Sequence, residues 1–362
     1  MTSLPLENIR IIDLSRLLPG PLATVMLQDM GAEVIKVEEP NGGDHLRQMP
    51  PLLKDGTNAL FHTLNRGKKS VTLDLKNETD KEKLLKLLKS ANVLVESFRP
   101  GFLKSIGLDP KDLQKKYPYL IICSITGFGQ KGEHAHQVGH DLNFIAQAGI
   151  LGHMANPGVP PVPMADLAGG TWPAVTQILA AIIKQQKAGE GCHIDISMTK
   201  GAANLMILQW AIKAAKESVK SANSELFQAK APCYNVYATK NGHIAIAALE
   251  NKFWNILVEA LNLSHLKDKG LSPNQDGEKV RKELQQNLLQ KTTEECINLF
   301  QPLNVCVEPV LDEENAISPS LIDIEIANET LKLPIIKFCD QLSSVKSQKA
   351  PKLGQDNDDL FK

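Results

Sequence analysis

Residues 9–37 read IRIIDLSRLLPGPLATVMLQDMGAEVIKV, and their pattern indicates how the first half of the chain folds. Residues 9–14 predict a short buried strand, because apolar side chains dominate them. After a loop at Pro19-Gly20-Pro21, residues 22–30 carry apolar side chains at helical spacing. Residues 32–37 predict a second strand. This order of strand, helix and strand indicates a right-handed βαβ unit and a parallel sheet.

The same alternation continues beyond this unit. Further strands are expected at residues 70–75, 93–96, 119–124 and 193–198, with helices at 81–88 and 172–187. The glycine pattern G-x-G-x-x-G does not follow the first strand, so the sequence gives no support for a dinucleotide site. We therefore expect an α/β fold whose large domain contains a parallel sheet.

The second half of the chain predicts a smaller unit. Two short strands flank the turn Lys240-Asn241-Gly242, which is typical of a β-hairpin. The expected elements are strands at 234–238, 243–247 and 306–311 and helices at 252–263 and 277–299. We expect the large domain at 1–200 and 325–362, a helical linker at 201–224, a small α+β domain at 225–305, and a return linker at 306–324, after which Pro334 to Phe338 lead back into the large domain.

Composition narrows the possible partners and location. Forty Lys and Arg residues nearly balance 41 Asp and Glu residues, for a net charge of −1. This balance argues against nucleic acid or an anionic membrane as the main partner. No apolar run is long enough to span a bilayer, and the first ten residues lack a secretory pattern, so we expect a cytoplasmic protein.

The cysteines carry no metal or disulfide signal. Six cysteines are scattered along the chain without C-x-x-C spacing, and several lie in apolar, strand-like contexts. In a reducing cytoplasm such residues are expected to be buried free thiols. We expect no metal site.

Three titratable side chains stand at junctions between a loop and a helix. His140 follows a glycine in Gly139-His140-Asp141, Asp166 precedes Gly169-Gly170, and Glu250 follows the second hairpin strand. Each could be structural, because Asp and Glu in a first helical turn often cap free N–H groups or complement the helix dipole. The functional alternative is a set of acid and base groups, with the Glu250 carboxylate orienting the His140 imidazole.

Several cations lie close to strand ends. Ordinary solvated loops would explain them, but ligands of open α/β sheets bind beyond the carboxyl ends of the strands, where cations suit phosphates. The candidates are Lys36, Arg66, Lys68, Lys69 and Arg99.

Taken together, these motifs resemble family III CoA-transferases (CaiB/BaiF) and, within that superfamily, the α-methylacyl-CoA racemases. The resemblance covers almost the whole chain. It is carried by residues 11–15, 31–38, 64–70, 96–101, 139–141, 165–170, 234–242, 306–311 and 351–354. It implies a large Rossmann-like parallel-sheet domain, a small α+β domain and an interlocked homodimer with shared active sites.

The resemblance also implies roles for individual residues. His140 and Asp166 would be the two acid and base groups of one subunit, Glu250 would come from the other subunit, and the backbone of Asp141 would stabilise the enolate oxygen. Coenzyme A would lie along the five cations as part of the substrate, with no prosthetic group. Two departures from the family pattern are Thr171 in place of a third glycine and Lys36 where arginine is common.

We therefore expect an enzyme of lipid metabolism that inverts the α-carbon of 2-methylacyl-CoA thioesters by proton transfer. The first alternative is a CoA-transferase in which Asp166 attacks the thioester and forms an acyl anhydride. The absence of a glycine-rich loop near Glu250 favours the racemase over this alternative. The second alternative is an inactive subunit that only binds coenzyme A.

Overall fold

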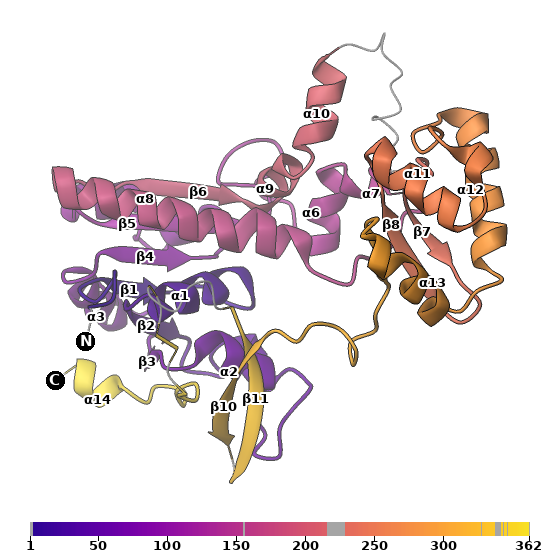
Figure 1. Ribbon diagram of the computed structural model, residues 1–362. Helices are drawn as coiled ribbons and strands as arrows, with labels where there is room; N and C mark the ends of the chain where they lie inside the picture. Colours follow the sequence, from indigo (N-terminus) through magenta and orange to yellow (C-terminus); the bar gives the residue numbers. More distant parts are fainter. Residues whose placement is uncertain are drawn as a thin grey trace. The chain divides into compact units, whose positions relative to one another are not determined.

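The computed structural model describes residues 3–154, 156–215, 229–326, 328–336, 342, 344–345 and 347–361. Cys339, Phe338 and the end of the expected linker, 216–224, lie outside the described residues. The chain divides into two units (Figure 1). The large unit comprises Met1–Ala148, Pro160–Leu205 and Pro319–Lys362, and the small unit comprises Gly149–Val159 and Met206–Ser318. Within the described residues, no helix is long and apolar enough to cross a membrane.

A six-stranded parallel sheet forms the centre of the large unit, in the order β3-β2-β1-β4-β5-β6. Its strands are β1 (Arg10–Asp13), β2 (Glu33–Glu38), β3 (Lys69–Thr72), β4 (Val93–Glu96), β5 (Ile121–Thr126) and β6 (His193–Ser197). The predicted parallel α/β sheet is therefore confirmed. The strand order reverses between β1 and β4, and in such sheets ligands bind beyond the carboxyl ends of the strands at this point.

Helices cover both faces of this sheet. On one face α1 (Pro19–Asp29) and α8 (Trp172–Ala188) contact each other and the strands. On the other face α3 (Glu78–Leu88), α4 (Phe102–Ser105) and α5 (Pro110–Lys116) share a core with alternate strand residues such as Ile12 and Ile122. Successive strand side chains point to opposite faces, so each strand supports both layers.

Helix α1 begins earlier than the sequence predicts. Pro19-Gly20-Pro21, expected as a loop, forms its first turn, where proline is well tolerated because the first N–H groups of a helix have no intrahelical partner. Gly20 is required for packing, since a Cβ at this position would overlap Ser15. The chain after β1 is therefore held tightly against the start of α1.

The small unit contains an antiparallel sheet in the order β7-β8-β9. Its strands are β7 (Tyr234–Ala238), β8 (His243–Ala247) and β9 (Val307–Pro309), and its main helices are α10 (Ile207–Ala214), α11 (Asn251–Ala260), α12 (Asn274–Leu288) and α13 (Thr293–Phe300). The predicted hairpin is confirmed. The apolar core of the unit surrounds Trp254, which is fully buried.

Two expectations for the small unit are wrong. The single helix expected at 277–299 is two helices, because Thr292 caps α13 with a side chain that accepts from the Glu295 N–H, while the Glu295 carboxylate accepts the Thr292 N–H. The strand expected at 306–311 is confirmed as β9, and because it pairs with β8 it belongs to the small sheet and not to the expected return linker at 306–324.

The end of the chain returns to the large unit. A hairpin that the sequence did not predict, β10 (Ser320–Ile326) and β11 (Glu329–Ile335), packs near α2 (Ala59–Asn65). The last helix, α14 (Asn357–Leu360), lies beside β3. Asp356 Oδ2 accepts the Ser70 N–H at 2.8 Å, and Asn357 Oδ1 accepts the Thr72 N–H at 2.9 Å.

The remaining helices include those that carry the predicted catalytic residues. They are α6 (Asp141–Gln147), α7 (Ile150–His153), the π-helix η2 (Ala165–Thr171) and α9 (Met198–Asn204), while η1 (His45–Gln48), η4 (Ser264–Leu266) and η5 (Gln301–Leu303) are short 3₁₀ turns. The long helix expected from residue 172 is confirmed as α8, but the π-helix before it was not predicted.

Candidate active site

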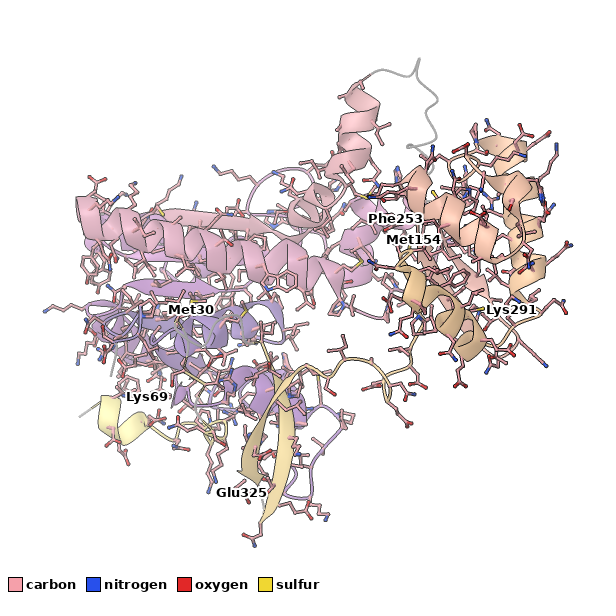
Figure 2. All side chains as sticks on the ribbon, viewed as in Figure 1. Met30, Lys69, Met154, Phe253, Lys291 and Glu325 are labelled. Carbon is pink, nitrogen blue, oxygen red and sulfur yellow. The ribbon has the colours of Figure 1, made fainter. Side chains whose placement is uncertain are left out.

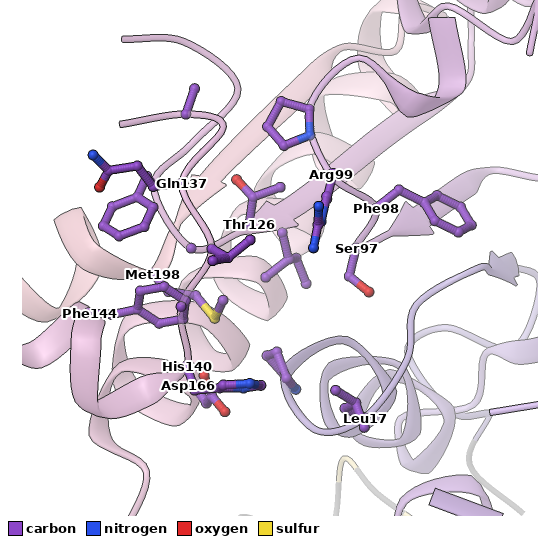
Figure 3. A pocket seen from close by; sticks show the side chains of 18 of the residues that line it. Leu17, Ser97, Phe98, Arg99, Thr126, Gln137, His140, Phe144, Asp166 and Met198 are labelled. Atoms are coloured by element: carbon purple, nitrogen blue, oxygen red, sulfur yellow. The ribbon is translucent and has the colours of Figure 1, made fainter. Parts of the chain in front are cut away.

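A hollow of about 370 Å³ opens in the large unit beyond the carboxyl ends of β1, β4 and β5 (Figure 3). Its walls come from the chain that follows each of these strands: Arg16 and Leu17 after β1, the Ser97–Pro100 turn after β4, and Gly127 and Phe128 after β5. His140, Phe144, Asp166 and Met198 are also among the lining residues. The hollow therefore lies where the strand order reverses, as expected for an open α/β sheet.

The structure brings two of the predicted catalytic residues, His140 and Asp166, into this hollow (Figure 3). His140 immediately precedes α6, and its backbone N–H donates to Asn143 Oδ1 at 3.1 Å. The imidazole is exposed to solvent, whereas the Asp166 carboxyl is partly buried. Two groups that can each carry a proton thus share one cavity, and each comes from the start of a different helix.

The environment of Asp166 favours a protonated carboxyl. Burial, which disfavours the charged form, raises the pKa of Asp166 to about 6, and the negative charge of Asp141 also raises it while His140 opposes both. A carboxyl with a pKa in this range exchanges a proton near neutral pH. Asp166 is therefore suited to accept and return a proton.

Asp141 links the two helix starts. Its Oδ1 accepts the backbone N–H of Ala165 at 2.6 Å and that of Asp166 at 3.0 Å. The Asp141 N–H itself belongs to the first turn of α6, where no intrahelical acceptor exists. That N–H stays the predicted donor for a substrate oxygen.

The backbone around Asp166 is an unusual one. Residues 165–171 form a π-helix, a conformation that occurs frequently at functional sites. Gly169 packs directly on α9, where a Cβ would overlap the Met198 carbonyl and approach the Ala202 N atom at 2.8 Å. Thr171, which departs from the family pattern, is fully buried, and its hydroxyl donates to the Pro19 carbonyl at 2.9 Å. Both contacts hold the helix that presents Asp166.

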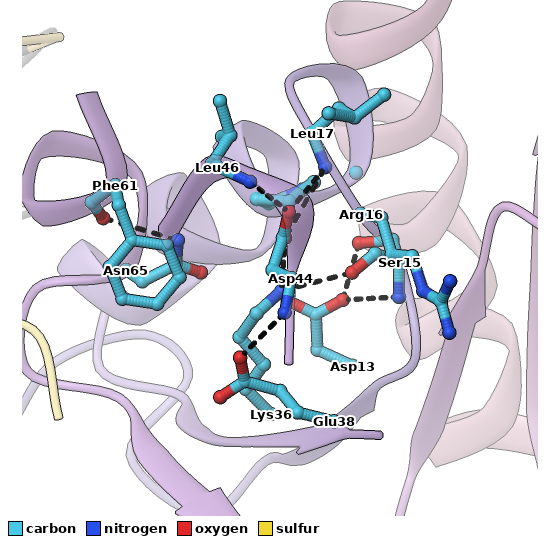
Figure 4. Close-up of polar contacts among 12 residues, drawn as sticks. Asp13, Ser15, Arg16, Leu17, Lys36, Glu38, Asp44, Leu46, Phe61 and Asn65 are labelled. Atoms are coloured by element: carbon cyan, nitrogen blue, oxygen red, sulfur yellow. Dashed lines mark hydrogen bonds and ion pairs between the residues drawn. The ribbon is translucent and has the colours of Figure 1, made fainter. Parts of the chain in front are cut away.

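Three of the five predicted coenzyme A cations, Lys36, Arg66 and Lys68, are buried within the large unit, which corrects that expectation. Figure 4 shows Lys36 beside Asp44. Lys36 Nζ lies 3.0 Å from Asp44, and Lys68 Nζ lies 3.0 Å from Asp13. Arg66 forms a bidentate pair with Asp29, at 2.6 and 2.5 Å. Because a buried charge needs a partner, these cations neutralise buried carboxylates and are closed to a phosphate.

The pair of Lys68 and Asp13 illustrates the electrostatics of this interior. Burial lowers the pKa of Lys68 to about 8, although the Asp13 carboxylate opposes the shift. Burial alone would raise the pKa of Asp13, but the charges of Lys68 and Lys36 hold it at about 2. Both groups are ionised at neutral pH, and each stabilises the other.

The remaining two predicted cations differ from each other. Lys69 opens β3, at the amino end of the sheet, and its Nζ lies 2.6 Å from Glu33 (Figure 2). Lys69 therefore lies at the opposite end of the sheet from the carboxyl ends of the strands. Arg99 follows β4 and is the member of the predicted set that lines the hollow.

Sequence reasoning missed Arg16. This residue lines the main hollow and also a second one of about 230 Å³, and the two hollows share Arg16 and Phe98. The Arg16 guanidinium lies 5.6 Å from the centre of the Phe98 ring. Lys76 lines the second hollow. The rule that singled out Arg99, a cation just beyond a strand, applies equally to Arg16 after β1.

Glu250 lies in the small unit, as the N-cap residue of α11. Its backbone carbonyl accepts the N–H groups of Phe253 and Trp254, whereas its carboxylate is not used to cap the helix and is exposed. The side chain therefore caps no N–H group of α11, and its place at the start of this helix still suits the structural alternative, a charge that complements the helix dipole. The pairing of Glu250 with His140 stays a prediction.

Other reactive groups in the described residues offer no competing site. Cys123, Cys233 and Cys296 are buried free thiols, Cys192 is partly exposed and Cys306 is exposed. Burial raises the pKa of the Cys123 thiol far above its usual range. No group of three or more His, Cys, Asp or Glu side chains in this part of the chain could hold a metal ion.

Comparison with known proteins gives consistent matches. The sequence matches the family model of CoA-transferase family III over residues 6–357. It is 32% identical to human alpha-methylacyl-CoA racemase over 319 residues, covering 86% of this chain and 79% of the racemase. It is 36% identical to mouse succinyl-CoA:glutarate CoA-transferase over 277 residues, covering 73% and 61%. The crystal structure of Rv3272 from M. tuberculosis, in its orthorhombic form, superposes with a TM-score of 0.83 at 27% identity, covering 98% of both chains.

Proposed function

The chain belongs to CoA-transferase family III, and we propose that it is a racemase that inverts the α-carbon of 2-methylacyl-CoA thioesters. One observation carries this proposal: His140 and Asp166 line the same hollow from two separate helix starts. Inversion by proton transfer requires one group on each face of the carbon, and this pair supplies two.

The proposed reaction moves one proton off the α-carbon and one onto it. For one enantiomer the neutral imidazole of His140 removes the α-proton, the electron pair shifts onto the thioester oxygen, and protonated Asp166 returns a proton to the opposite face. For the other enantiomer the roles reverse, with the Asp166 carboxylate as base and the His140 imidazolium as acid. A pKa of about 6 for Asp166 allows it to serve in both directions near neutral pH.

The enolate oxygen needs fixed donors, because negative charge develops on it as the α-proton leaves. We assign this role to the backbone N–H of Asp141, as the family resemblance implies. Its carboxylate is already bonded to the N–H groups of Ala165 and Asp166, so the position of this residue is fixed before substrate binds. Donors that are fixed in advance stabilise the transition state without reorganisation.

Coenzyme A is assigned to the two adjoining hollows. The acyl end lies near His140 and Asp166, and the rest of the molecule passes Arg16 and Phe98 into the second hollow. Arg16, Arg99 and Lys76 then replace the buried lysines as the cations that meet phosphate. Coenzyme A is part of the substrate in this proposal, and no prosthetic group is required.

We also propose a cytoplasmic homodimer in which Glu250 of one subunit orients His140 of the other. The exposed carboxylate of Glu250 supports this arrangement, since it makes no capping hydrogen bond to its own helix. Helix α10 supports it too: Ile207, Leu208 and Trp210 are 68%, 53% and 52% exposed, and a contiguous apolar surface of this kind is typical of a contact with another chain.

A CoA-transferase is the second candidate, and the similarity to the mouse transferase favours it. In that reaction the Asp166 carboxylate attacks the thioester carbon, the coenzyme A thiolate leaves, and an acyl anhydride forms. A nucleophilic carboxylate must be ionised, so with a pKa of about 6 the reactivity of Asp166 as a nucleophile would fall as the pH drops below that value. His140 has no required step in this mechanism.

Incubation with a single enantiomer of a 2-methylacyl-CoA in heavy water separates the candidates. A racemase incorporates deuterium at the α-carbon and loses optical purity without an acceptor acid. A transferase exchanges coenzyme A only when an acceptor acid is present, and His140→Ala retains that exchange while Asp166→Ala abolishes it. A chain that binds coenzyme A by calorimetry but catalyses neither reaction would be an inactive binding subunit.

A further inference from the structure

A row of polar side chains crosses the sheet next to the hollow and takes no part in the proposed reaction. Glu96 is the last residue of β4 and is 3% exposed. In the strand register it lies beside Ser124 of β5, which lies beside Asp195 of β6. Paired residues of neighbouring strands point to the same face of a sheet, so these three side chains form one row.

Hydrogen bonds connect Ser124 to Glu96 and to His193 of β6, whereas the Asp195 carboxylate bonds to Gln130. The Ser124 side chain bonds to Glu96, and its oxygen lies 2.9 Å from His193 Nε2. When Glu96 is ionised its carboxylate can only accept, so in that state the single hydroxyl proton of Ser124 is donated to Glu96 and the Nε2–H tautomer of His193 donates to Ser124. Glu96 is thus the final acceptor of a chain that begins at His193.

The Glu96 carboxylate also holds a wall of the hollow. Its Oε2 accepts the backbone N–H of Phe98 at 2.7 Å. Phe98 and Arg99 both line the hollow, and the Ser97 hydroxyl oxygen accepts the Arg16 N–H at 3.0 Å. The turn that follows β4 is therefore fixed from the sheet by Glu96 and from the neighbouring loop by Arg16.

Asp195 holds the opposite wall in the same way. Its two carboxylate oxygens accept the Gln130 N–H at 3.0 and 3.1 Å. Gln130 lies in the loop after β5, close to Gly127 and Phe128, which line the hollow. The two ends of the polar row thus anchor the two loops between which the hollow lies.

The charge of Glu96 is sensitive to pH in the neutral range. Burial raises the pKa of Glu96 to about 7, the bonds from Ser124 and Phe98 lower it, and Asp195 raises it. No lysine or arginine among the described residues contributes to this shift. The titratable groups around it are Cys123, His193 and Asp195, with Asp109 and Lys131 beyond His193.

We propose that Glu96 is a positioning residue for coenzyme A binding, because its carboxylate fixes the turn that presents Phe98 and Arg99. The inference rests on the proposed binding of coenzyme A in these hollows. A hydrogen bond to an ionised carboxylate is roughly twice as strong as one to a neutral acceptor, so the turn is held firmly when Glu96 is ionised and less firmly when it is protonated. Coenzyme A therefore binds more tightly above neutral pH than below it.

Calorimetric titration with coenzyme A between about pH 5.5 and about pH 8.5 tests the proposal. Glu96→Gln should weaken binding about tenfold at the alkaline end and leave it nearly unchanged at the acid end, since one hydrogen bond loses its charge. The control is Glu82→Gln, the same substitution at an exposed position of α3, which should follow the wild-type curve. Titration of the ligand's own phosphate is common to all three proteins and cancels in the comparison.

A second variant keeps the test decisive if Glu96→Gln unfolds. Ser124→Ala removes a hydrogen bond that favours ionised Glu96, so the pH at which binding weakens should move upward. If Ser124 had only a structural role, Ser124→Ala would lower thermal stability without moving the midpoint pH of coenzyme A binding. The double variant Glu96→Gln, Arg99→Ala should bind no more weakly than Arg99→Ala alone, because Glu96 acts through the turn that carries Arg99.

The outcomes distinguish this inference from the proposed function. If the wild-type protein does not bind coenzyme A, the proposed function fails. If it binds coenzyme A but Glu96→Gln follows the wild-type curve at every pH, or Ser124→Ala leaves the midpoint in place, the positioning role is wrong while the proposed function stands.

Discussion

The carboxylate of Asp141 accepts the backbone N–H groups of both Ala165 and Asp166. Asp141 directly follows His140, so this contact ties the chain at His140 to the chain at Asp166. The contact has two effects. It fixes the distance between the helix starts that carry the two proposed proton carriers, and it places a negative charge near Asp166 that raises the pKa of this carboxyl. The geometry and the proton affinity of the pair are thus set by one side chain.

Asp141→Asn should shift the pH profile of catalysis downward. Removing the charge removes one cause of the raised pKa, so Asp166 should ionise about one pH unit lower. For the enantiomer whose proton Asp166 removes, the acid limb of the deuterium-uptake profile should move by the same amount. Asp112→Asn, at an exposed pair with Lys115, is the control. An unmoved limb would show that Asp141 does not tune Asp166.

Replacing either proton carrier alone should restrict deuterium exchange to one enantiomer, and the two replacements should leave different enantiomers. In His140→Ala, Asp166 can still remove and return a proton on its own face, so only one enantiomer takes up deuterium, with retention of configuration. Asp166→Ala should exchange only the other enantiomer. Inversion should fall by about 10²–10⁴-fold in each variant, as measured by chiral chromatography. Exchange of both enantiomers by either variant would contradict the two-base assignment.

Lys68→Met should destabilise the protein rather than weaken coenzyme A binding specifically. Removing Lys68 leaves Asp13 buried without its main partner, which should cost about 3–5 kcal/mol of unfolding free energy in a urea titration. The matched control is Lys69→Met, because the exposed pair with Glu33 should contribute less than about 1 kcal/mol. Equal losses in the two variants would contradict this distinction.

The same pair predicts a dependence on acid. The folded pKa of Asp13, about 2, lies below its ordinary value of 3.8. The native state therefore binds fewer protons than the unfolded state in this window, and the stabilisation is complete above about pH 4 and is lost as the pH falls toward 2. Asp13→Asn should remove this part of the acid transition, measured as the difference in unfolding free energy between about pH 5 and about pH 2.5.

Arg16→Ala should raise the dissociation constant for coenzyme A by about tenfold, since one cation near the phosphates is lost. Lys69→Ala should leave it unchanged, because Lys69 stands at the amino end of the sheet. Calorimetry at low and high salt gives a second readout, as the effect of Arg16→Ala should shrink when ionic strength rises. The reverse ranking would restore the original assignment of Lys69.

Gly169→Ala should disturb the π-helix that carries Asp166. A Cβ there meets the backbone of α9, which cannot rotate away, so we expect a loss of about 1–3 kcal/mol in unfolding free energy and reduced deuterium exchange. Gly152→Ala is the control, because a Cβ at that helical glycine has no neighbour within 4 Å. A neutral Gly169→Ala would show that the two backbones can separate.

The features that local sequence patterns determine were predicted correctly. Apolar runs placed all six strands of the large sheet, and the family resemblance implied that His140 and Asp166 share one site. The prediction failed for Lys36, Lys68 and Arg66, because their partners Asp44, Asp13 and Asp29 carry no signal in the sequence around the cations. A cation near a strand end looks the same in sequence whether it meets a phosphate or a buried carboxylate.

Other features depend on packing alone. The π-helix at residues 165–171 arises where Gly169 meets α9, a contact between segments that helical spacing does not encode. Glu96 was predicted as the last residue of a strand and as part of the 96–101 motif, and neither prediction showed that its carboxylate holds the turn after β4 while Asp195 holds the loop after β5. The signal that could have found it is a glutamate within an otherwise apolar parallel strand, which requires a buried partner.

Asp356 and Asn357 accept hydrogen bonds from the backbone of β3. These bonds also block the pairing of a further strand with this edge of the sheet. β3 is an edge strand, and unpaired N–H groups on an edge can recruit a strand from another molecule. Here the N–H groups of Ser70 and Thr72 are already occupied. Loss of the segment from Asp356 onward would expose a polymerisation surface on an otherwise folded protein, so aggregation rather than inactivation is the expected first symptom of such a truncation.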